Sequence, residues 1–415
     1  MTFEALPAIL VTGAIAAVMA FLLTPWAMRF ATRSGAVDQP DSGRRIHVRP
    51  IPRAGGLAVA AAFVVVGLIA LGLQWQTELY AAGRPWQLDR WLLSENEVVA
   101  VFGGAVLAAA FGFVDDKWQI RARWQFLFQV VLALFAIALG LQILEINNPL
   151  EFLGGVFADD TLVFEGVLAA LVTALWIVGM INSINFIDGL DGLSVGVAII
   201  AAFTLGFVSL GYESSYQPIV ALVCAVLAGS LLGYLPWNFN PAQVFVGTTG
   251  VMVMGYLLAV LAILGSAKVA VALLILGVPI IDTFWIITRR LLSGHSPFTP
   301  DRGHIHHRLL DLGLSHRGVV LLIYAITATL AVASVLLAGG SGPIYAFMAI
   351  VVGSGIVLLV ITFRGTDEAL EATTYDEDAL AAVAPSPDPA AASEPRAAEE
   401  QVSRPAPPSD RGHAG

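Results

Sequence analysis

Long apolar stretches separated by short polar segments dominate the pattern of residues along this chain. Eleven runs are each apolar over about twenty residues, the length of a helix that crosses the hydrocarbon core of a bilayer. The runs cover residues 6–28, 55–74, 98–114, 125–144, 165–182, 193–211, 218–235, 247–265, 269–287, 318–338 and 344–363. This pattern predicts an all-α polytopic membrane protein with about eleven transmembrane helices.

Composition favours a membrane protein over a set of soluble domains. Hydrophobic residues make up 57% of the 415 residues and charged residues only 13%, and the mean hydropathy is +0.80. A soluble domain is roughly one-quarter charged. Residues 1–364 form the predicted transmembrane domain. Residues 365–415 hold eleven acids, three Arg and seven Pro, which predicts a disordered acidic tail.

Lys and Arg are distributed unevenly between the loops, which predicts the orientation. One side carries fifteen of them, in residues 29–54, 115–124 and 288–317 and at Arg364, and the other side carries only Arg84, Arg90 and Lys268. By the positive-inside rule the side with fifteen is cytoplasmic. With an odd number of spans, the N-terminus is then outside and the C-terminus cytoplasmic. Arg29 and Arg33 follow the first apolar run, an order opposite to that of a cleaved signal peptide, so this run is expected to be retained.

The stretch NSINFIDGLDG follows directly after an apolar run. It places two carboxamides and two carboxylates at intervals of three residues: Asn182, Asn185, Asp188 and Asp191. In a helix such steps keep successive side chains on one face. The simpler interpretation is a helix-end turn, since Asp-Gly favours turns. The functional interpretation is a polar, acidic edge at the mouth of a membrane helix.

Asp115 and Asp116 are adjacent at the predicted cytoplasmic end of the third apolar run. A carboxylate inside hydrocarbon costs roughly 2.5–3.5 kcal/mol on insertion scales. The pair is either a solvated interfacial cluster, with Lys117, Arg121 and Arg123 nearby, or a Mg²⁺ site that activates a phosphate.

Two further polar segments face the same side of the membrane. GRRIHVRPIPRAGG, which includes Arg53, predicts either attraction to anionic lipid headgroups or phosphate binding. SPFTPDRGHIHHRLLDLGLSHR holds His304, His306 and His307. These are interpreted as solvated loop residues, as a zinc site with Asp301, or as groups for proton transfer and phosphate contact.

Asp282 lies within the apolar run 269–287. An acid inside the membrane marks a functional site by default. The alternative interpretation is that Asp282 lies near the cytoplasmic end of this run. There it would form an ion pair with Arg289 or Arg290, one or two helical turns further on.

All these clusters lie on one predicted face, and none includes an activated Ser or Cys. This arrangement suits transfer of a phosphorylated group from a soluble nucleotide compound to a membrane-held acceptor, with positioning and charge neutralisation as the main contributions. A lipid-phosphate or nucleotide-sugar transporter is the alternative, although it would place polar groups near mid-membrane and the chain has no convincing internal repeat. No feature predicts a nucleic-acid partner.

Together these motifs resemble those of a known family, the polyprenyl-phosphate N-acetylhexosamine-1-phosphate transferases. The resemblance rests, between Arg44 and Arg317, on PRAGG, VDDKWQIRARWQF, NSINFIDGLDGLSVG, FNPAQVFVG, PIIDTFW and HIHHRLLDLGLSHR. The HIHHRL form is similar to the WecA and TagO branch. It implies transfer of a sugar 1-phosphate, by default from UDP-N-acetylglucosamine, to undecaprenyl phosphate with release of UMP. The implied setting is the cytoplasmic face of a bacterial cell membrane, at the start of lipid-linked cell-wall or surface-glycan synthesis.

The resemblance also implies roles for individual residues. It assigns binding of Mg²⁺, or of Mn²⁺ in its place, together with catalysis, to Asp115, Asp116, Asp188 and Asp191. It adds His304 as a catalytic residue and assigns substrate contacts to Arg53, Asn182, Asn185, His306, His307 and Arg308. A homodimer is compatible with the family.

One position departs from the family pattern. Where the family carries Gly-Asp-Ser/Ala-Gly with an Asp that binds Mg²⁺, this chain reads GTTG, with Thr248 in place of that Asp. A neutral hydroxyl does not supply the missing charge. We expect a working enzyme with an altered metal shell, and the alternative is an inactive homologue that only binds ligands.

Overall fold

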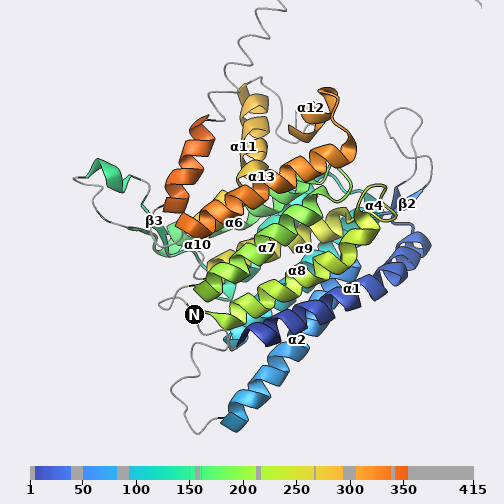
Figure 1. The fold of residues 1–415 in the computed structure, drawn as a ribbon, viewed down its shortest axis with the longest axis horizontal. Coiled ribbons are helices and arrows are strands. Elements are labelled where there is room, and N and C mark those ends of the chain that lie inside the picture. Colours follow the sequence, from blue (N-terminus) through green and yellow to red (C-terminus); the bar gives the residue numbers. More distant parts are fainter. Residues whose placement is uncertain are drawn as a thin grey trace, which may run out of the picture. The chain divides into compact units, whose positions relative to one another are not determined.

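A computed structural model gives the fold (Figure 1). It describes residues 5–38, 50–81, 93–148, 150–154, 159, 161–211, 216–265, 268–292, 305–337 and 342–353. These residues belong to one compact unit, Met1–Gly355. The predicted tail, 365–415, and the end of the last apolar run lie outside the described residues.

Helices make up nearly all of this unit. They are α1 (Leu6–Ser34), α2 (Gly56–Ala81), α3 (Glu95–Val98), the π-helical turn η3 (Val99–Gly103), α4 (Gly104–Trp118), α5 (Ala122–Ala138), α6 (Gly166–Ile187), α7 (Leu193–Gly211), α8 (Pro218–Asn238), α9 (Gly247–Leu264), α10 (Lys268–Ile275), α11 (Gly277–Leu292), α12 (Ile305–Asp311) and α13 (His316–Leu337). A further apolar helix spans Gly342–Gly353. Two antiparallel strand pairs join them, β1 (Val37–Asp38) with β2 (Ile51–Pro52) and β3 (Glu145–Asn147) with β4 (Thr161–Val163). A 3₁₀ turn, η4 (Glu151–Leu153), lies between β3 and β4.

The prediction of a mostly helical, multi-pass membrane protein is confirmed. Among the described residues, eight helices are long and apolar enough to cross a membrane, or up to nine if the bent pair α10–α11 is one span. α5 has 17 residues and the described part of the last helix is Gly342–Gly353, so both fall short of that length. The count of eleven spans and the direction of the termini stay predictions.

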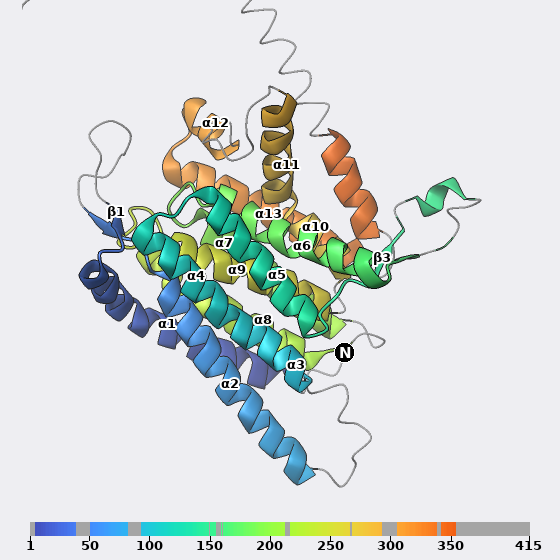
Figure 2. The ribbon, with the colours of Figure 1, turned by 180° about the vertical axis from the view of Figure 1, so that it is seen from behind.

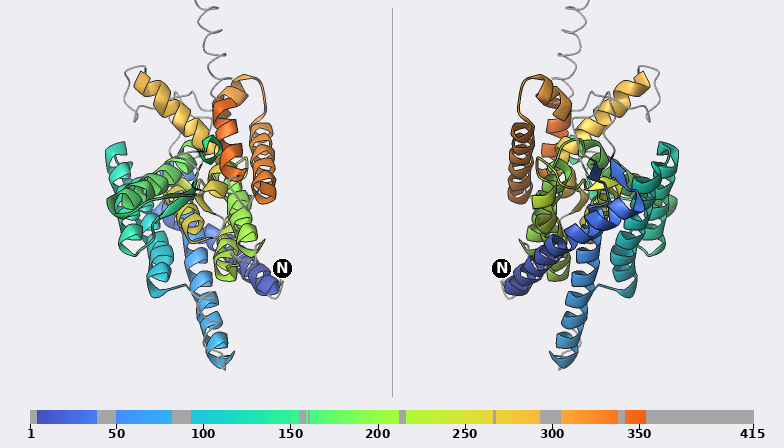
Figure 3. Two further views of the ribbon diagram at one scale, coloured as in Figure 1. Left: turned by 90° about the vertical axis from the view of Figure 1, so that its left-hand side faces the viewer. Right: turned by 90° about the vertical axis from the view of Figure 1, so that its right-hand side faces the viewer.

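The run predicted at 269–287 is not one straight helix. α10 and α11 meet at a bend of 80°. Pro279 lies in the first turn of α11, where its missing N–H is tolerated but where it prevents α10 from continuing through that position. Figures 1 and 3 show α11 leaving the direction of the neighbouring helices as a result.

α8 and α9 form the centre of the bundle. In each, 83% of the spanning window is buried, as expected of helices that are apolar on all sides. α1 and α7 pack along α8, while α4 and α6 pack along α9 (Figure 2). In α1 only 17% of the window is buried, so its outer face has the exposed apolar character of a lipid-facing helix.

The connections that carry the polar motifs meet at one end of the bundle. The segment before α2 pairs with the segment before α9, through Phe245 N to Pro52 O at 2.9 Å and Gly55 N to Phe245 O at 3.0 Å. The turn between α6 and α7 is bonded to the C-terminus of α8, through Gly192 N to Asn238 Oδ1 at 3.1 Å. Residues far apart in the sequence are therefore assembled into one site.

Candidate active site

Asp115 lies in the last turn of α4, where the negative end of the helix dipole disfavours a carboxylate. Three donors offset this. Its Oδ1 accepts from Ile120 N at 3.0 Å and from Gln125 Nε2 at 2.9 Å, and its Oδ2 accepts from the hydroxyl of Thr248 at 2.5 Å. α4 ends where Gln119 takes a left-handed conformation with φ of 46°, which turns the chain back toward Asp115.

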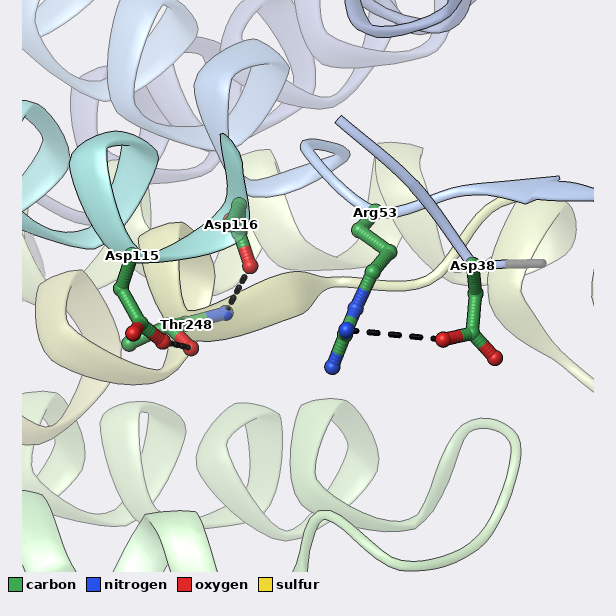
Figure 4. A network of polar contacts seen from close by, with 5 residues as sticks. All are labelled: Asp38, Arg53, Asp115, Asp116 and Thr248. Atoms are coloured by element: carbon green, nitrogen blue, oxygen red, sulfur yellow. Dashed lines mark hydrogen bonds and ion pairs between the residues drawn. The ribbon is translucent and has the colours of Figure 1, made fainter. Parts of the chain in front are cut away.

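Asp116 is held by the first turn of α9. Its Oδ1 accepts from Thr248 N at 2.8 Å (Figure 4). Its Oδ2 accepts from Thr249 N at 3.0 Å and from the Thr249 hydroxyl at 2.5 Å. The free amides at a helix N-terminus carry partial positive charge, so this turn suits a buried carboxylate. Asp116 is only 2% exposed.

Two glycines allow α9 to come this close. A Cβ at Gly112 of α4 would overlap the backbone of Thr249. Gly247 has φ of +67°, and a Cβ there would overlap the carbonyl of Arg53 and meet the Asp116 carboxylate. The contact between α4 and α9 therefore requires glycine at both positions.

Arg53 brings the positive charge to this group. It lies between β2 and α2, and its guanidinium pairs with Asp38 at 3.4 Å. Figure 4 places it between Asp38 and Asp116. Its predicted role in phosphate or substrate binding stays a prediction.

Asp188 and Asp191 lie in the turn between α6 and α7. Asp188 Oδ1 accepts from the Ser194 hydroxyl at 2.5 Å. Asp191 Oδ2 accepts from Asn240 Nδ2 at 3.0 Å and from Ala242 N at 3.1 Å. The turn predicted from Asp-Gly is therefore present, and the acidic edge is present as well.

The two acid pairs are close enough to interact electrostatically. Desolvation raises the pKa of Asp188 to about 7, and the hydrogen bond from Ser194 opposes this rise. The charges of Asp116 and Asp191 raise this pKa further, whereas Arg53 lowers it. Both pairs thus belong to one region with an excess of negative charge.

Several residues of this region were not predicted as site residues. His316 Nε2 accepts from Asp191 N at 3.1 Å, and Arg317 donates to Asn240 O at 3.0 and 2.7 Å. The hydroxyl of Tyr324 donates to Gly192 O. His316 and Arg317 end the motif HIHHRLLDLGLSHR, so their presence in that motif was the available signal. Gln125, Thr249, Asn238 and Asn240 also belong to this network.

The carboxamides of α6 differ in their surroundings. Asn182 Nδ2 donates to Gln129 Oε1 at 2.6 Å and to Val178 O at 2.8 Å, which ties α6 to α5. Asn185 is half-buried near the end of α6. Substrate contacts for both stay predictions, and for Asn182 the pairing with Gln129 adds a structural role.

The histidine motif approaches the site through α12. His306 is 1% exposed and lies against Gly189, where a Cβ would overlap its ring. Arg308 is half-buried on the same helix. His304, like Asp301, lies outside the described residues, as does the side chain of His307.

Asp282 holds the start of α12, since its Oδ1 accepts from Ile305 N at 3.0 Å. Of the two interpretations of this residue, the ion pair with Arg289 or Arg290 involves side chains outside the described residues. The structure instead gives Asp282 the position of a helix cap supplied by α11.

The described residues include no group of three or more His, Cys, Asp or Glu side chains that would hold a metal ion by themselves. The four acids instead form two pairs, with Arg53 nearby. Mg²⁺ commonly takes one or two carboxylates and completes its shell with phosphate oxygens and water. The excess negative charge around Asp188 fits such an ion in the presence of a phosphate-bearing substrate.

A bundle of apolar helices with buried carboxylates and an arginine gathered at one end defines a multi-pass membrane protein with a site for phosphate chemistry. Comparison with known proteins agrees. Residues 98–266, which include all four acids and Thr248, match glycosyl transferase family 4.

Full-length relatives extend the match beyond this region. The chain is 35% identical to the probable undecaprenyl-phosphate N-acetylglucosaminyl 1-phosphate transferase of Bacillus subtilis over 79% of this chain and 85% of that protein. It is 34% identical to the decaprenyl-phosphate N-acetylglucosaminephosphotransferase of Mycolicibacterium smegmatis, over 86% and 90%. The undecaprenyl-phosphate alpha-N-acetylglucosaminyl 1-phosphate transferase of Escherichia coli O157:H7 is 27% identical over 75% and 79%. The chain therefore belongs to glycosyl transferase family 4.

Proposed function

We propose that the protein transfers N-acetylglucosamine 1-phosphate from UDP-N-acetylglucosamine to a polyprenyl phosphate, with undecaprenyl phosphate as the first candidate carrier, and releases UMP. The names of the relatives, as polyprenyl-phosphate N-acetylglucosamine-phosphate transferases, support this proposal. The structural observation that carries it is that one segment, which runs from Asn240 into the first turn of α9, binds both Asp191 and the Asp115–Asp116 pair at one end of a membrane bundle.

The proposed reaction needs no nucleophile from the protein. A phosphate oxygen of the carrier attacks the sugar-bearing β-phosphorus, and the bond from that phosphorus to the bridging oxygen breaks. The bridging oxygen leaves with UMP, and the product is a polyprenyl diphosphate sugar. Holding the two substrates in line and offsetting their charge are then the main contributions of the site.

The proposed roles are those that the resemblance to the family implies. Asp115 and Asp116, at the buried end of α4, face the phosphate of the carrier, and Arg53 offers paired donors to phosphate oxygens. Asp188 and Asp191 belong to the nucleotide-sugar side, with Asn182 and Asn185. The loop and helix that carry His304, His306, His307 and Arg308 form the diphosphate side.

Mg²⁺, or Mn²⁺ in its place, is part of the proposal. When bound, the ion offsets negative charge on the diphosphate and on the leaving UMP. The residues that would hold it come from Asp115, Asp116, Asp188 and Asp191. The proposed site faces the cytoplasm of a bacterial cell, because fifteen of the Lys and Arg residues lie in the loops of that side.

The direct test uses the purified full-length chain in lipid nanodiscs. It is incubated with undecaprenyl or decaprenyl phosphate and with a panel of UDP-sugars, with and without Mg²⁺, and UMP and lipid-linked sugar are measured. We expect both products from UDP-N-acetylglucosamine. Absence of UMP with every donor and carrier would overturn the proposal.

The second candidate is an inactive homologue that binds ligands, for which Thr248 in the first turn of α9 is the motivation. Titration calorimetry with UDP-N-acetylglucosamine separates the two. Binding without turnover supports the inactive homologue, and binding with turnover excludes it.

A further inference from the structure

The first turn of α9 supplies most of the donors around the two acids of α4. Thr248 contributes its hydroxyl to Asp115 and its backbone amide to Asp116, and Thr249 contributes both its amide and its hydroxyl to Asp116. With Ile120 N and Gln125 Nε2, each carboxylate accepts three hydrogen bonds. A carboxylate has about four acceptor positions. Each therefore keeps little capacity for a further ligand.

The acids of the α6–α7 turn are held differently. Asp188 Oδ1 accepts from the hydroxyl of Ser194, and Asp191 Oδ2 accepts from Asn240 and Ala242. These bonds use one oxygen of each carboxylate. Within the described residues, the acids of α4 thus accept more hydrogen bonds than those of the turn.

Thr248 has a distinct place in this arrangement. Its hydroxyl lies 2.5 Å from Asp115 Oδ2, whereas Ile120 N and Gln125 Nε2 both donate to Oδ1. The Thr248 hydroxyl therefore fixes the rotation of the carboxylate about its Cβ–Cγ bond. Since Thr248 is β-branched and lies in the first turn of α9, its χ1 is restricted to few rotamers, which limits the positions of its hydroxyl oxygen.

We propose that Thr248 is a positioning residue, which orients Asp115 through its hydroxyl, and that Asp115 and Asp116 act as carboxylates held by the protein rather than as ligands of the divalent cation. This inference rests on the proposed function and narrows its four candidate metal ligands to Asp188 and Asp191. It predicts that the metal requirement and the orientation of Asp115 respond to different substitutions.

Three substitutions at residue 248 separate the orientation of Asp115 from the binding of the divalent cation. Thr248→Val keeps the shape of the side chain and removes the donor. Thr248→Ser keeps the donor and removes a methyl group. Thr248→Asp places a third carboxylate against Asp115, a repulsion that a divalent cation would relieve.

Steady-state kinetics tests the positioning role. We expect Thr248→Val to lower kcat by about 10- to 100-fold, with the KM values for both substrates within about threefold of the wild type. Thr248→Ser is expected to retain most of the wild-type kcat. A Val variant with unchanged kcat, or a Ser variant as impaired as the Val variant, would overturn the role of the hydroxyl.

The metal role is tested without turnover by measuring Mn²⁺ binding to the same purified chains. Binding is monitored by the loss of the free-ion electron paramagnetic resonance signal. We expect Asp115→Asn to change Mn²⁺ affinity by less than about tenfold and Thr248→Asp to raise it by more than that. A wild type without measurable Mn²⁺ binding agrees with the inference when Thr248→Asp binds it. A tenfold or greater loss in Asp115→Asn, or no gain in Thr248→Asp, overturns it. If the wild type releases no UMP, the proposed function fails, while the Mn²⁺ series still decides this inference.

Discussion

The imidazole Nε2 of His316 accepts a hydrogen bond from the backbone amide of Asp191 at 3.1 Å, across 125 positions of the chain. An acceptor at Nε2 requires the neutral ring with its proton on Nδ1. His316 begins α13, so the contact fixes the α6–α7 turn against that helix. The contact holds the backbone that carries the Asp191 carboxylate, so we expect the orientation of this carboxylate to depend on His316.

We expect His316→Phe to leave the Asp191 amide without this acceptor. The cost is about 1–3 kcal/mol of stability, since a partly buried donor loses its partner, and kcat/KM should fall because the turn is less well held. Thermal unfolding and UMP release measure the two effects. His316→Gln is the matched control, since its amide oxygen is able to accept from the same N–H and should preserve more of both quantities. Equal losses in the two variants would contradict the importance of the acceptor.

The two acids of α4 should respond differently to conversion to Asn. In Asp115→Asn, the new NH₂ can face Thr248, whose hydroxyl is able to accept as well as donate, so the fold should be retained while turnover is lost. In Asp116→Asn, both side-chain positions face backbone N–H groups, of Thr248 and Thr249. This variant should therefore also lose about 1–3 kcal/mol of stability.

The measurement for this pair is unfolding in detergent together with UMP release. Retained activity in Asp115→Asn would contradict the proposed role of that residue. An Asp116→Asn variant as stable as the wild type would contradict the hydrogen bonds from the first turn of α9.

Gly189→Ala should displace α12. A Cβ at residue 189 would overlap the ring of His306, and such overpacking typically costs about 1–3 kcal/mol. His306→Ala removes the ring, so the double variant Gly189→Ala/His306→Ala should recover stability relative to Gly189→Ala alone. Activity need not recover, because His306 is itself a candidate substrate contact. Additive losses of stability in the double variant would show that the two residues are not in contact.

Asp282→Ala should loosen the start of α12, because Ile305 N loses the carboxylate that accepts its hydrogen bond. Loss of such a cap costs about 0.5–2 kcal/mol. Hydrogen exchange at residues 305–311 is expected to become faster, and Asp282→Asn, which keeps an acceptor, should change it less. Unchanged exchange in the Ala variant would argue against the cap.

Periodic and compositional features were predictable from the sequence. The apolar runs identified the helices, and the spacing of Asp188 and Asp191 after one run predicted an acidic edge at a helix end. These are local properties, since a helix and its terminal turn depend on neighbouring residues. The bend between α10 and α11 was not predicted, because the apolar pattern continues through Pro279 without a change.

Partners far apart in the sequence were not predictable in the same way. The sequence placed Thr248 where the resemblance implies an acid, but it did not show that the hydroxyl meets Asp115 or that Thr249 binds Asp116. Similarly, it marked Asn182 as a substrate contact and gave no sign of Gln129, which lies on another helix. Such pairs are set by how α4, α5, α6 and α9 pack, and a single sequence holds no direct record of that packing.

The hydrogen bond between Thr248 and Asp115 spans 133 positions of the chain. During synthesis, α4 is complete long before α9 exists, and a growing chain that ends before residue 247 contains none of the four donors from the first turn of α9. The acids of α4 reach their final, largely dehydrated surroundings only after α5, α6, α7 and α8 have been made and α9 has docked. Assembly of this end of the bundle is thus ordered in time, because the carboxylates are translated well before the turn that encloses them.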